Sequence, residues 1–333
     1  MNTEQMLAAV ISRPGGPEVL ELRTVPRPQP ESTEILVRVR ASALNRADLL
    51  QRRGHYPAPP GAPTDIPGLE FAGEVEQIGS VVQLWKPGNR VMGLTGGGAH
   101  AGYLVAHERA VMEIPRSLTW EQAAAIPEAF ITAHDALWIQ AALRANEQVL
   151  IHAVSSGVGL AALQLTRAMG AIPSGTSRTA DKLVRAKEFG LESGFLVPAS
   201  PTTEEGRKWA ADRAFDVVLD LAGGSYLNAS LQALAHRGRI VLIGTMAGAK
   251  SEIDLGLMLG KRVRMIGTVL RARPLEEKIA VTRSFAREVL PFFESKVLHV
   301  VIDSEFPFQD IRKAHERMES NQTFGKIVLR MSD

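Results

Sequence analysis

An apolar run that meets two closely spaced glycines constrains this 333-residue chain more than any other feature. Residues 149–154 form the run, Gly157 and Gly159 lie in the turn, and an apolar helical pattern begins at Leu160. A strand that passes into a helix in this way directs bare backbone N–H groups and the positive helix end toward an anion, and glycine lets a phosphate approach the main chain. Val154 stands where a three-glycine fingerprint has its first glycine. We therefore expect a dinucleotide site on the two remaining glycines.

The sequence after about residue 126 alternates between apolar strands and helical patterns. Its strand candidates are rich in Val, Leu and Ile, as strands buried on both faces of a sheet require. Strands are predicted at 148–154, 171–175, 215–220, 239–244 and 263–270, and helices at 159–169 and 180–189. This pattern predicts an α/β unit with a doubly wound parallel sheet.

Residues 1 to about 125 contain shorter strands and many turns. Residues 34–40 alternate between polar and apolar side chains, which is typical of a half-buried strand, and five prolines between Pro57 and Pro67 predict an irregular loop. Further strands are predicted at 6–12, 71–79 and 89–93. We expect a partly open β-barrel. Later elements at 275–294 (helix), 298–303 (strand), 309–318 (helix) and 326–329 (strand) are expected to return to it.

Composition excludes several classes of function. The net charge is +2 without a dense basic block, so no nucleic-acid partner is expected. No apolar span reaches the roughly 18 residues of a membrane helix, so we expect no membrane partner and a cytoplasmic location. The chain has no cysteine, Leu69 precedes Glu70, and the eight histidines lack metal-ligand spacing. We therefore predict no metal site.

The choice of cofactor depends on the residues that follow the second strand of the α/β unit. Ser177, Arg178 and Lys182 suit a 2′-phosphate, whereas Asp181 comes late enough to lie in the first turn of the next helix. This favours NADPH over NADH. The alternative interpretation is a solvated polar turn.

Several segments resemble the zinc-free quinone oxidoreductases of the medium-chain dehydrogenase/reductase superfamily. They are 41–49, 68–70, 123–128, 152–159 and 325–329. The resemblance implies a GroES-like domain interrupted by a Rossmann domain, with 1–126 and 271–333 in the former and 127–270 in the latter. It also implies NADPH-dependent dimers or tetramers. Residues 262–269 are predicted to end the sheet, and an unpaired edge favours a homodimer.

The same resemblance implies three catalytic residues. Asn45 is similar to an asparagine near the nicotinamide and substrate, Tyr56 to a tyrosine at the mouth of the substrate cleft, and Ser156 to a serine near the nicotinamide. Simpler roles remain open: Asn45 as a cap of the next turn, Tyr56 as a packed ring, and Ser156 as a turn residue.

The expected cofactor-binding residues come from the glycine turn, the polar segment after the second strand and the resemblance. They are Thr132, Ser156, Gly157, Val158, Gly159, Ser177, Arg178, Lys182, Gly244, Met246, Leu270 and Arg271. Many relatives carry a tyrosine near the adenosine phosphate where this chain has Val197. Phosphate recognition would then depend more on Ser177, Arg178 and Lys182.

The expected reaction is hydride transfer from NADPH to a quinone or another electron-poor conjugated carbonyl. One alternative is reduction of the carbon–carbon double bond of a 2-enal or 2-enone on the same scaffold. Another is a non-enzymatic protein that binds NADPH or RNA, although no basic, aromatic-rich segment favours RNA.

Overall fold

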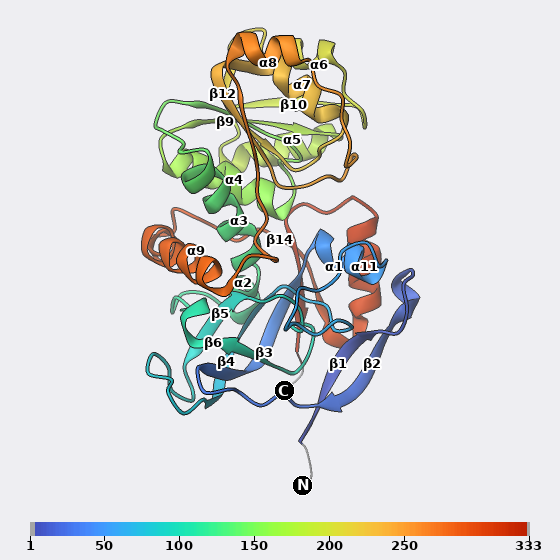
Figure 1. Ribbon diagram of the computed structural model, residues 1–333, viewed down its shortest axis with the longest axis vertical. Helices are drawn as coiled ribbons and strands as arrows, with labels where there is room; N and C mark the ends of the chain where they lie inside the picture. The colour runs from blue at the N-terminus through green and yellow to red at the C-terminus, as the bar shows by residue number, and fades with distance from the viewer. Residues whose placement is uncertain (1–3, 332–333) are drawn as a thin grey trace. The chain divides into compact units, whose positions relative to one another are not determined.

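The chain divides into two compact units in the computed structural model, which describes residues 4–331 (Figure 1). Unit 1 comprises Met1–Ile131 and Leu270–Asp333, and unit 2 comprises Thr132–Val269. Each unit has its own sheet and core. Within the described range no helix is long and apolar enough to cross a membrane.

Unit 1 is built on a seven-stranded sheet and a separate hairpin. The hairpin pairs β1 (Gln5–Ile11) with β2 (Leu20–Pro26). The sheet has the order β14-β15-β3-β4-β5-β7, and β6 pairs with β3. Its strands are β3 (Glu34–Leu44), β4 (Glu70–Ile78), β5 (Arg90–Leu94), β6 (Tyr103–His107), β7 (Val111–Glu113), β14 (Ile302–Pro307) and β15 (Lys326–Arg330).

The long strand β3 decides which residues meet at one edge of this sheet. Its second half pairs antiparallel with β15, where Leu44 lies opposite Ile327, and with β4, where Ser42 lies opposite Phe71. Antiparallel pairing brings the carboxyl end of one strand beside the amino ends of its partners. The residues that follow β3 therefore lie beside the first residues of β4 and β15.

Helices cover this sheet through apolar contacts. Leu44, Leu49, Ile311 and Ile327 belong to one buried cluster, which packs α1 and α11 against β3 and β15. The α-helices of unit 1 are α1 (Arg46–Arg52), α2 (Trp120–Ala124), α9 (Leu275–Glu288), α10 (Pro291–Glu294) and α11 (Ile311–Glu319). A π-helical turn, η3 (Pro127–Ile131), follows α2.

Unit 2 is a six-stranded parallel sheet with the order β10-β9-β8-β11-β12-β13. Its strands are β8 (Gln148–Ile151), β9 (Ile172–Ser177), β10 (Ser193–Leu196), β11 (Phe215–Asp220), β12 (Leu234–Leu242) and β13 (Arg264–Gly267). Its helices are α3 (Thr132–His134), the π-helical η4 (Asp135–Gln140), α4 (Gly157–Ala168), α5 (Ala180–Ala186), α6 (Thr203–Trp209), α7 (Ser225–Ala233) and α8 (Leu255–Lys261).

This strand order is that of the dinucleotide-binding Rossmann fold. In chain order the strands run 3-2-1-4-5-6, so the order reverses between β8 and β11. Ligands of such sheets bind at the carboxyl ends of the strands beside this reversal. The predicted fold class, a GroES-like domain with a Rossmann domain, is confirmed.

Some predicted elements differ from the structure. β10 was missed, because a strand of four residues leaves little periodicity. The strand expected to reach residue 154 ends at Ile151, and Ala153 takes a positive φ of 48°. The helix expected at 275–294 is broken before Pro291, which has no N–H to continue it. The strand expected at 298–303 begins only at Ile302, after Leu298 has been buried in the core.

Candidate active site

The glycine turn of unit 2 connects β8 to the first turn of α4. The Ser156 hydroxyl accepts a hydrogen bond of 3.0 Å from the Gly159 N–H and caps the helix. A Cβ on Gly159 would lie 2.4 Å from the Ala153 carbonyl oxygen, so only glycine fits this close approach. Gly157 and Val158 occupy the first turn, where N–H groups have no acceptor within the helix. The arrangement fits a bound phosphate.

Val154 does not obstruct this turn, although it replaces the first glycine of the three-glycine fingerprint. Its side chain is fully buried against Gly175 of β9. A Cβ on Gly175 would lie only 2.6 Å from the Val154 Cβ. Because Gly175 has no side chain, the Val154 side chain fits into the space beside β9.

The end of β9 carries the residues predicted to hold a 2′-phosphate. Ser177 is the last residue of the strand, and its hydroxyl accepts a hydrogen bond of 3.2 Å from the Thr179 N–H. Arg178 is exposed, and Lys182 lies half-buried in the first turn of α5. Val197 is buried in the core beneath this edge, together with Tyr226. No acidic side chain lies at the end of β9, where NAD-binding proteins place one.

The carboxyl ends of the next strands carry further predicted positions. Gly244 is half-buried and Met246 is exposed, and both follow β12. Thr132 is half-buried at the start of α3. Sequence reasoning missed Asp220, the last residue of β11, whose Oδ1 accepts hydrogen bonds from the N–H groups of Ala222 and Gly223. A buried acid three residues before the first glycine of a Gly-Gly pair could have signalled this turn.

His152 lies in the core of unit 2 rather than in its turn. Its ring is fully buried between Thr176, 3.1 Å from Nδ1, and Ser230, 2.7 Å from Nε2. Ser230 donates its own proton to the Tyr226 carbonyl oxygen, so it accepts from Nε2–H, and Nδ1 accepts from Thr176. Burial lowers the pKa of His152 to about 4. The neutral ring is structural.

Unit 1 assembles a polar cluster where β3, β4 and β15 meet. Glu70 is fully buried, and its Oε1 accepts hydrogen bonds from Asn45 Nδ2 at 2.9 Å and from Lys326 Nζ at 2.5 Å. Lys326 also donates to Asn45 Oδ1 at 2.7 Å and to the Leu44 carbonyl oxygen at 3.0 Å. Both ends of the Asn45 amide are therefore engaged within the protein. These contacts suit a residue that holds the Glu70 and Lys326 side chains in place. The predicted contact of Asn45 with substrate stays a prediction.

Glu128 joins this cluster from the π-helical turn η3. Its backbone N–H donates a hydrogen bond of 2.7 Å to Glu70 Oε2, and its side chain is half-buried. Burial, and then the charge of Glu70, raise the pKa of the Glu128 carboxyl to about 8. π-helical turns occur often at functional sites. In the sequence, Glu128 belongs to the segment 123–128 that carries the resemblance, and no local pattern there indicates a role for it.

Tyr56 lies in the proline-rich loop, and Arg271 holds that loop in place. Arg271 is buried and donates to the carbonyl oxygens of Gly96 and Tyr56, at 2.8 and 3.2 Å, and to Gln51 Oε1. Its guanidinium carbon lies 4.9 Å from the centre of the Tyr56 ring. Burial raises the pKa of Tyr56, so its hydroxyl stays protonated. Leu270 is buried beside Arg271. The cofactor contacts predicted for both residues remain predictions.

A serine, a histidine and an aspartate also lie together in unit 1. Ser42 Oγ is 2.9 Å from His100 Nδ1, and His100 Nε2 is 3.8 Å from Asp48 Oδ2. All three side chains are fully buried. A nucleophilic serine must reach its substrate, so this group is not a hydrolytic triad. Asp48 instead accepts hydrogen bonds from the Asn45 and Gly68 N–H groups, and so joins the start of α1 to the segment that precedes β4.

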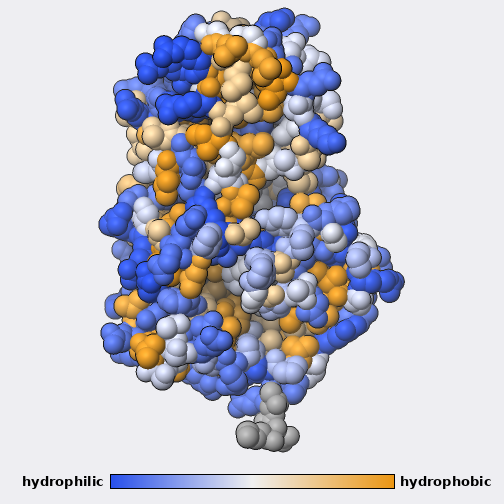
Figure 2. All heavy atoms as spheres, in the orientation of Figure 1, coloured by the Kyte–Doolittle hydropathy of each residue, from blue (hydrophilic) through white to orange (hydrophobic). Residues whose placement is uncertain are grey.

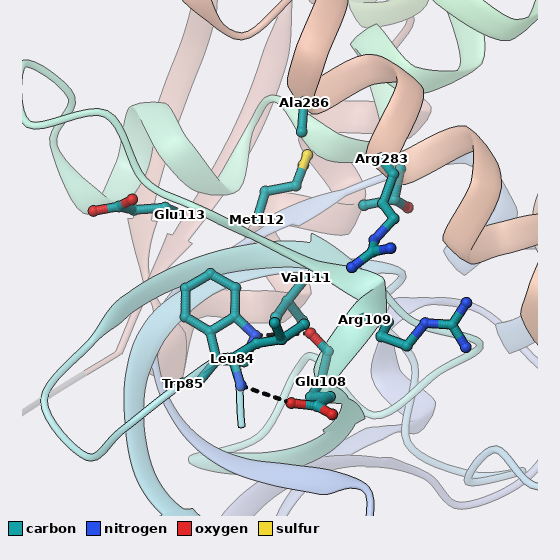
Figure 3. Close-up of a pocket in the computed structure, with 10 residues that line it drawn as sticks. Leu84, Trp85, Glu108, Arg109, Val111, Met112, Glu113, Arg283 and Ala286 are labelled. Carbon is teal, nitrogen blue, oxygen red and sulfur yellow. Dashed lines mark hydrogen bonds between the residues drawn. The ribbon is translucent and has the colours of Figure 1, made fainter. Parts of the chain in front are cut away.

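A surface pocket of about 340 Å³ lies elsewhere in unit 1, between α9 and the segment around β7 (Figure 3). It is lined by Leu84, Trp85, Glu108, Arg109, Val111, Met112, Glu113, Thr282, Arg283 and Ala286. The Glu108 carboxylate accepts hydrogen bonds from the Gln83 and Leu84 N–H groups, and Arg109 is paired with Glu276. The pocket shares no residue with the Glu70 cluster and contains none of the predicted site residues.

The predicted residues thus form two groups, one in each unit. Asn45, Tyr56, Leu270 and Arg271 belong to unit 1, and the remaining predicted positions belong to unit 2. Within residues 4–331, no three His, Cys, Asp or Glu side chains are grouped so that they could hold a metal ion.

Comparisons with known proteins agree with this architecture. Residues 31–116 match the family model described as the alcohol dehydrogenase GroES-like domain, and residues 196–329 match the model described as zinc-binding dehydrogenase. The quinone oxidoreductase of Homo sapiens is 30% identical over 318 residues, which cover 95% of this chain and 94% of that protein.

Solved structures show the same similarity. A quinone oxidoreductase of Pseudomonas syringae pv. Tomato superimposes with a TM-score of 0.87 at 28% identity, covering 98% of this chain and 99% of its own. A mycobacterial protein solved in complex with NADPH gives a TM-score of 0.86 at 26% identity, with coverage of 98% and 99%. The two-unit fold, the glycine turn and the full-length similarity together place this chain in the quinone oxidoreductase family of the medium-chain dehydrogenase/reductases, whose members are oxidoreductases with a nicotinamide cofactor.

Proposed function

We propose that this protein uses NADPH to reduce quinones or similar electron-poor conjugated carbonyls, without a metal ion. The strand–turn–helix of β8 and α4 carries the proposal. Ser156 caps α4, and Gly159 packs against the turn so closely that a side chain is excluded. The similarity to quinone oxidoreductases supports the choice of acceptor.

The end of β9 supports NADPH over NADH. Arg178 is exposed directly after the strand, Ser177 is its last residue, and Lys182 follows in the first turn of α5. Two cations and a hydroxyl suit a dianionic phosphate, while an acid for the ribose 2′-hydroxyl is absent from this strand end. The similar mycobacterial structure holds NADPH.

The chemistry of the available ligands supports zinc independence. A catalytic zinc needs three protein ligands of the cysteine, histidine or carboxylate type. The chain has no cysteine, and the carboxylate of Glu70 is already held by Lys326 and Asn45. The buried ammonium group of Lys326 makes this position unsuitable for a cation.

Bound NADPH would supply a hydride, and the chain's residues must supply position and charge. Ser156 and the first turn of α4 would hold the phosphates. The Tyr56 hydroxyl forms no hydrogen bond with any residue in the described range, so it is available to donate to a carbonyl oxygen. Reduction gives a quinone an aromatic ring, so the acceptor itself contributes much of the driving force. Positioning then accounts for most of the protein's contribution.

The test is to mix purified protein with NADPH and each of a panel of acceptors and to follow the absorbance of NADPH. We expect oxidation of NADPH with 1,2-naphthoquinone or 9,10-phenanthrenequinone. Product analysis with a 2-enone distinguishes the alternative, because an alkene reductase leaves the carbonyl intact. Tight binding of NADPH without oxidation by any acceptor would reject an enzymatic function.

We further propose that the protein is a homodimer assembled along β13. This strand lies at one edge of the six-stranded sheet, and an unpaired edge invites pairing with a second chain. Leu255 and Leu259 of α8 are 66% and 77% exposed in the same unit. Hydrophobic residues gather on the surface over α8 (Figure 2).

A further inference from the structure

Glu70 and Glu128 are neighbouring carboxyl groups that receive very different numbers of hydrogen-bond donors. Glu70 accepts from Asn45 Nδ2, Lys326 Nζ and the Glu128 backbone N–H. The Glu128 carboxyl accepts no hydrogen bond from any residue within 4–331. Donors stabilise the ionised form of a carboxyl group, and a neighbouring carboxylate destabilises it. Glu128 is therefore the member of the pair that more readily retains its proton.

The charges that face Glu128 come from every element around it. Glu70 of β4 and Asp48 of α1 oppose its ionisation, whereas Lys326 of β15 and Arg271, which precedes α9, favour it. Glu128 also interacts electrostatically with Lys278 of α9 and with Tyr56 of the proline-rich loop. Its carboxyl group therefore lies in the same region of unit 1 as the Tyr56 hydroxyl.

We propose that Glu128 is the proton donor of this site, and that its carboxyl group hydrogen-bonds to an oxygen of the acceptor and then protonates it. The inference rests on the reductase function proposed above. It gives a role to Glu128, which belongs to one of the segments that carry the resemblance but had no role assigned to it. It also answers how a carbonyl oxygen is activated in a site whose chemistry does not suit a metal ion.

The reaction balances with this assignment. Conversion of a quinone to a hydroquinone consumes one hydride and one proton. The hydride comes from NADPH, which is oxidised, while the Glu128 O–H bond breaks and a new O–H bond forms on the acceptor. Glu128 is left as a carboxylate near Lys326 and Arg271, whose charges stabilise it until solvent returns a proton.

The other polar groups of the cluster are less suited to this step. Both hydrogens of the Asn45 amide donate within the protein, and the three protons of Lys326 are shared among Leu44, Asn45 and Glu70. The pKa of Tyr56 lies above its usual value, so the phenol donates a hydrogen bond more readily than a proton. A general acid works best when its pKa is close to the working pH. Glu128 meets this condition at about 8.

The experiment compares wild type with Glu128→Gln at saturating NADPH, with 1,2-naphthoquinone as acceptor, across the neutral and alkaline pH range. Glutamine preserves the shape and one hydrogen-bond donor but cannot give up a proton. For the wild type we expect kcat/KM to fall above about pH 8. For Glu128→Gln we expect a value roughly 100-fold lower at neutral pH, without that break. Glu113→Gln, at an exposed glutamate of unit 1, is the matched control and should behave as wild type.

A Glu128→Gln enzyme with the wild-type rate and pH profile would overturn the assignment while leaving the reductase function intact. A second measurement does not need turnover. In ¹³C NMR of protein labelled at the glutamate carboxyl carbons, we expect one signal that titrates near pH 8 and is missing from the Glu128→Gln spectrum. If the Glu128 signal instead titrates in the ordinary range of glutamate, the assignment is wrong whether or not the protein reduces quinones.

Discussion

At the scale of single residues, the function of a side chain depends on the partners that it already has. Asn45 and Glu128 both belong to segments that resemble the quinone oxidoreductases, yet the cluster engages the Asn45 amide completely and leaves the Glu128 carboxyl without a donor. A sequence pattern predicts that both residues belong to a site. It does not predict which of them is available, because Lys326 is more than 250 positions away from Glu70 in the chain.

The raised pKa of Glu128 predicts a change of stability with pH. Its pKa is about 8 in the folded chain and about 4.5 in the unfolded one, so the folded state holds an extra proton between these values. Stability from this group is therefore fully present below about pH 4.5 and is lost as the pH rises toward 8, at about 1.4 kcal/mol per pH unit. Glu128→Gln lacks this dependence.

Urea denaturation of both proteins at several pH values measures the effect. The free energy of unfolding of Glu128→Gln minus that of wild type should increase as the pH rises through this window. Contributions from other titrating groups cancel in the difference. A difference that does not change with pH would show that Glu128 titrates normally.

The proposed contact of Arg178 with the 2′-phosphate can be tested through the preference for NADPH over NADH. Loss of Arg178 removes a charged partner of the 2′-phosphate, and a hydrogen bond to a charged group contributes about 1.5–3 kcal/mol. Arg178→Ala should therefore weaken NADPH binding roughly 10- to 100-fold and leave NADH binding unchanged. Fluorescence titration with each cofactor measures both affinities. Arg213→Ala, at an exposed arginine outside the β9 edge, serves as control; equal losses for NADPH and NADH would refute the assignment.

At the scale of elements, the strand–turn–helix of unit 2 shows what a local pattern determines. The apolar run, the two glycines and the helix were predictable because every contact that defines them lies within a few residues. The accommodation of Val154 was not, because the compensating Gly175 lies on the next strand. Likewise, β10 was missed because it has only four residues. The break at Pro291 was missed because the apolar pattern continues across it.

Gly159 and Gly260 form a matched pair for testing the turn. A Cβ on Gly159 would meet the Ala153 and Val154 carbonyl oxygens at 2.4 and 2.7 Å, whereas one on Gly260 of α8 would meet no atom within 4 Å. Gly159→Ala should lose roughly 1–3 kcal/mol of stability and most NADPH affinity. Gly260→Ala should gain about 0.4–1 kcal/mol. Thermal unfolding and NADPH titration measure both; full affinity in Gly159→Ala would contradict the proposed phosphate site.

At the scale of the whole molecule, the sequence predicted two fold types and the return of the chain to the first of them. It predicted less about the cluster of unit 1, because Asn45, Glu70, Glu128 and Lys326 come from four separate segments. Their meeting depends on the register of β3 with β4 and β15. Strand register is set by packing over the whole sheet rather than by any one strand.

The proposed dimer is tested at the two edges of the unit 2 sheet. Ile266→Lys places a charge on β13, and Leu196→Lys places one on β10 at the opposite edge. Charged edge strands resist pairing. Light scattering should give a dimer for wild type and Leu196→Lys and a monomer for Ile266→Lys. A monomeric wild type at micromolar concentration would refute the dimer, and a dimeric Ile266→Lys would place the interface elsewhere.

The position of Lys326 in the chain has a consequence for biosynthesis. Chains emerge from the ribosome amino end first, and domains fold as their segments become available. Unit 2 is a continuous segment, so it can fold while synthesis is under way. Unit 1 cannot be completed at the same time, because Glu70 is buried with a lysine of β15, a strand that follows unit 2 in the sequence. Until that strand arrives, the nascent protein contains a finished cofactor domain and an acidic cluster that still lacks its lysine.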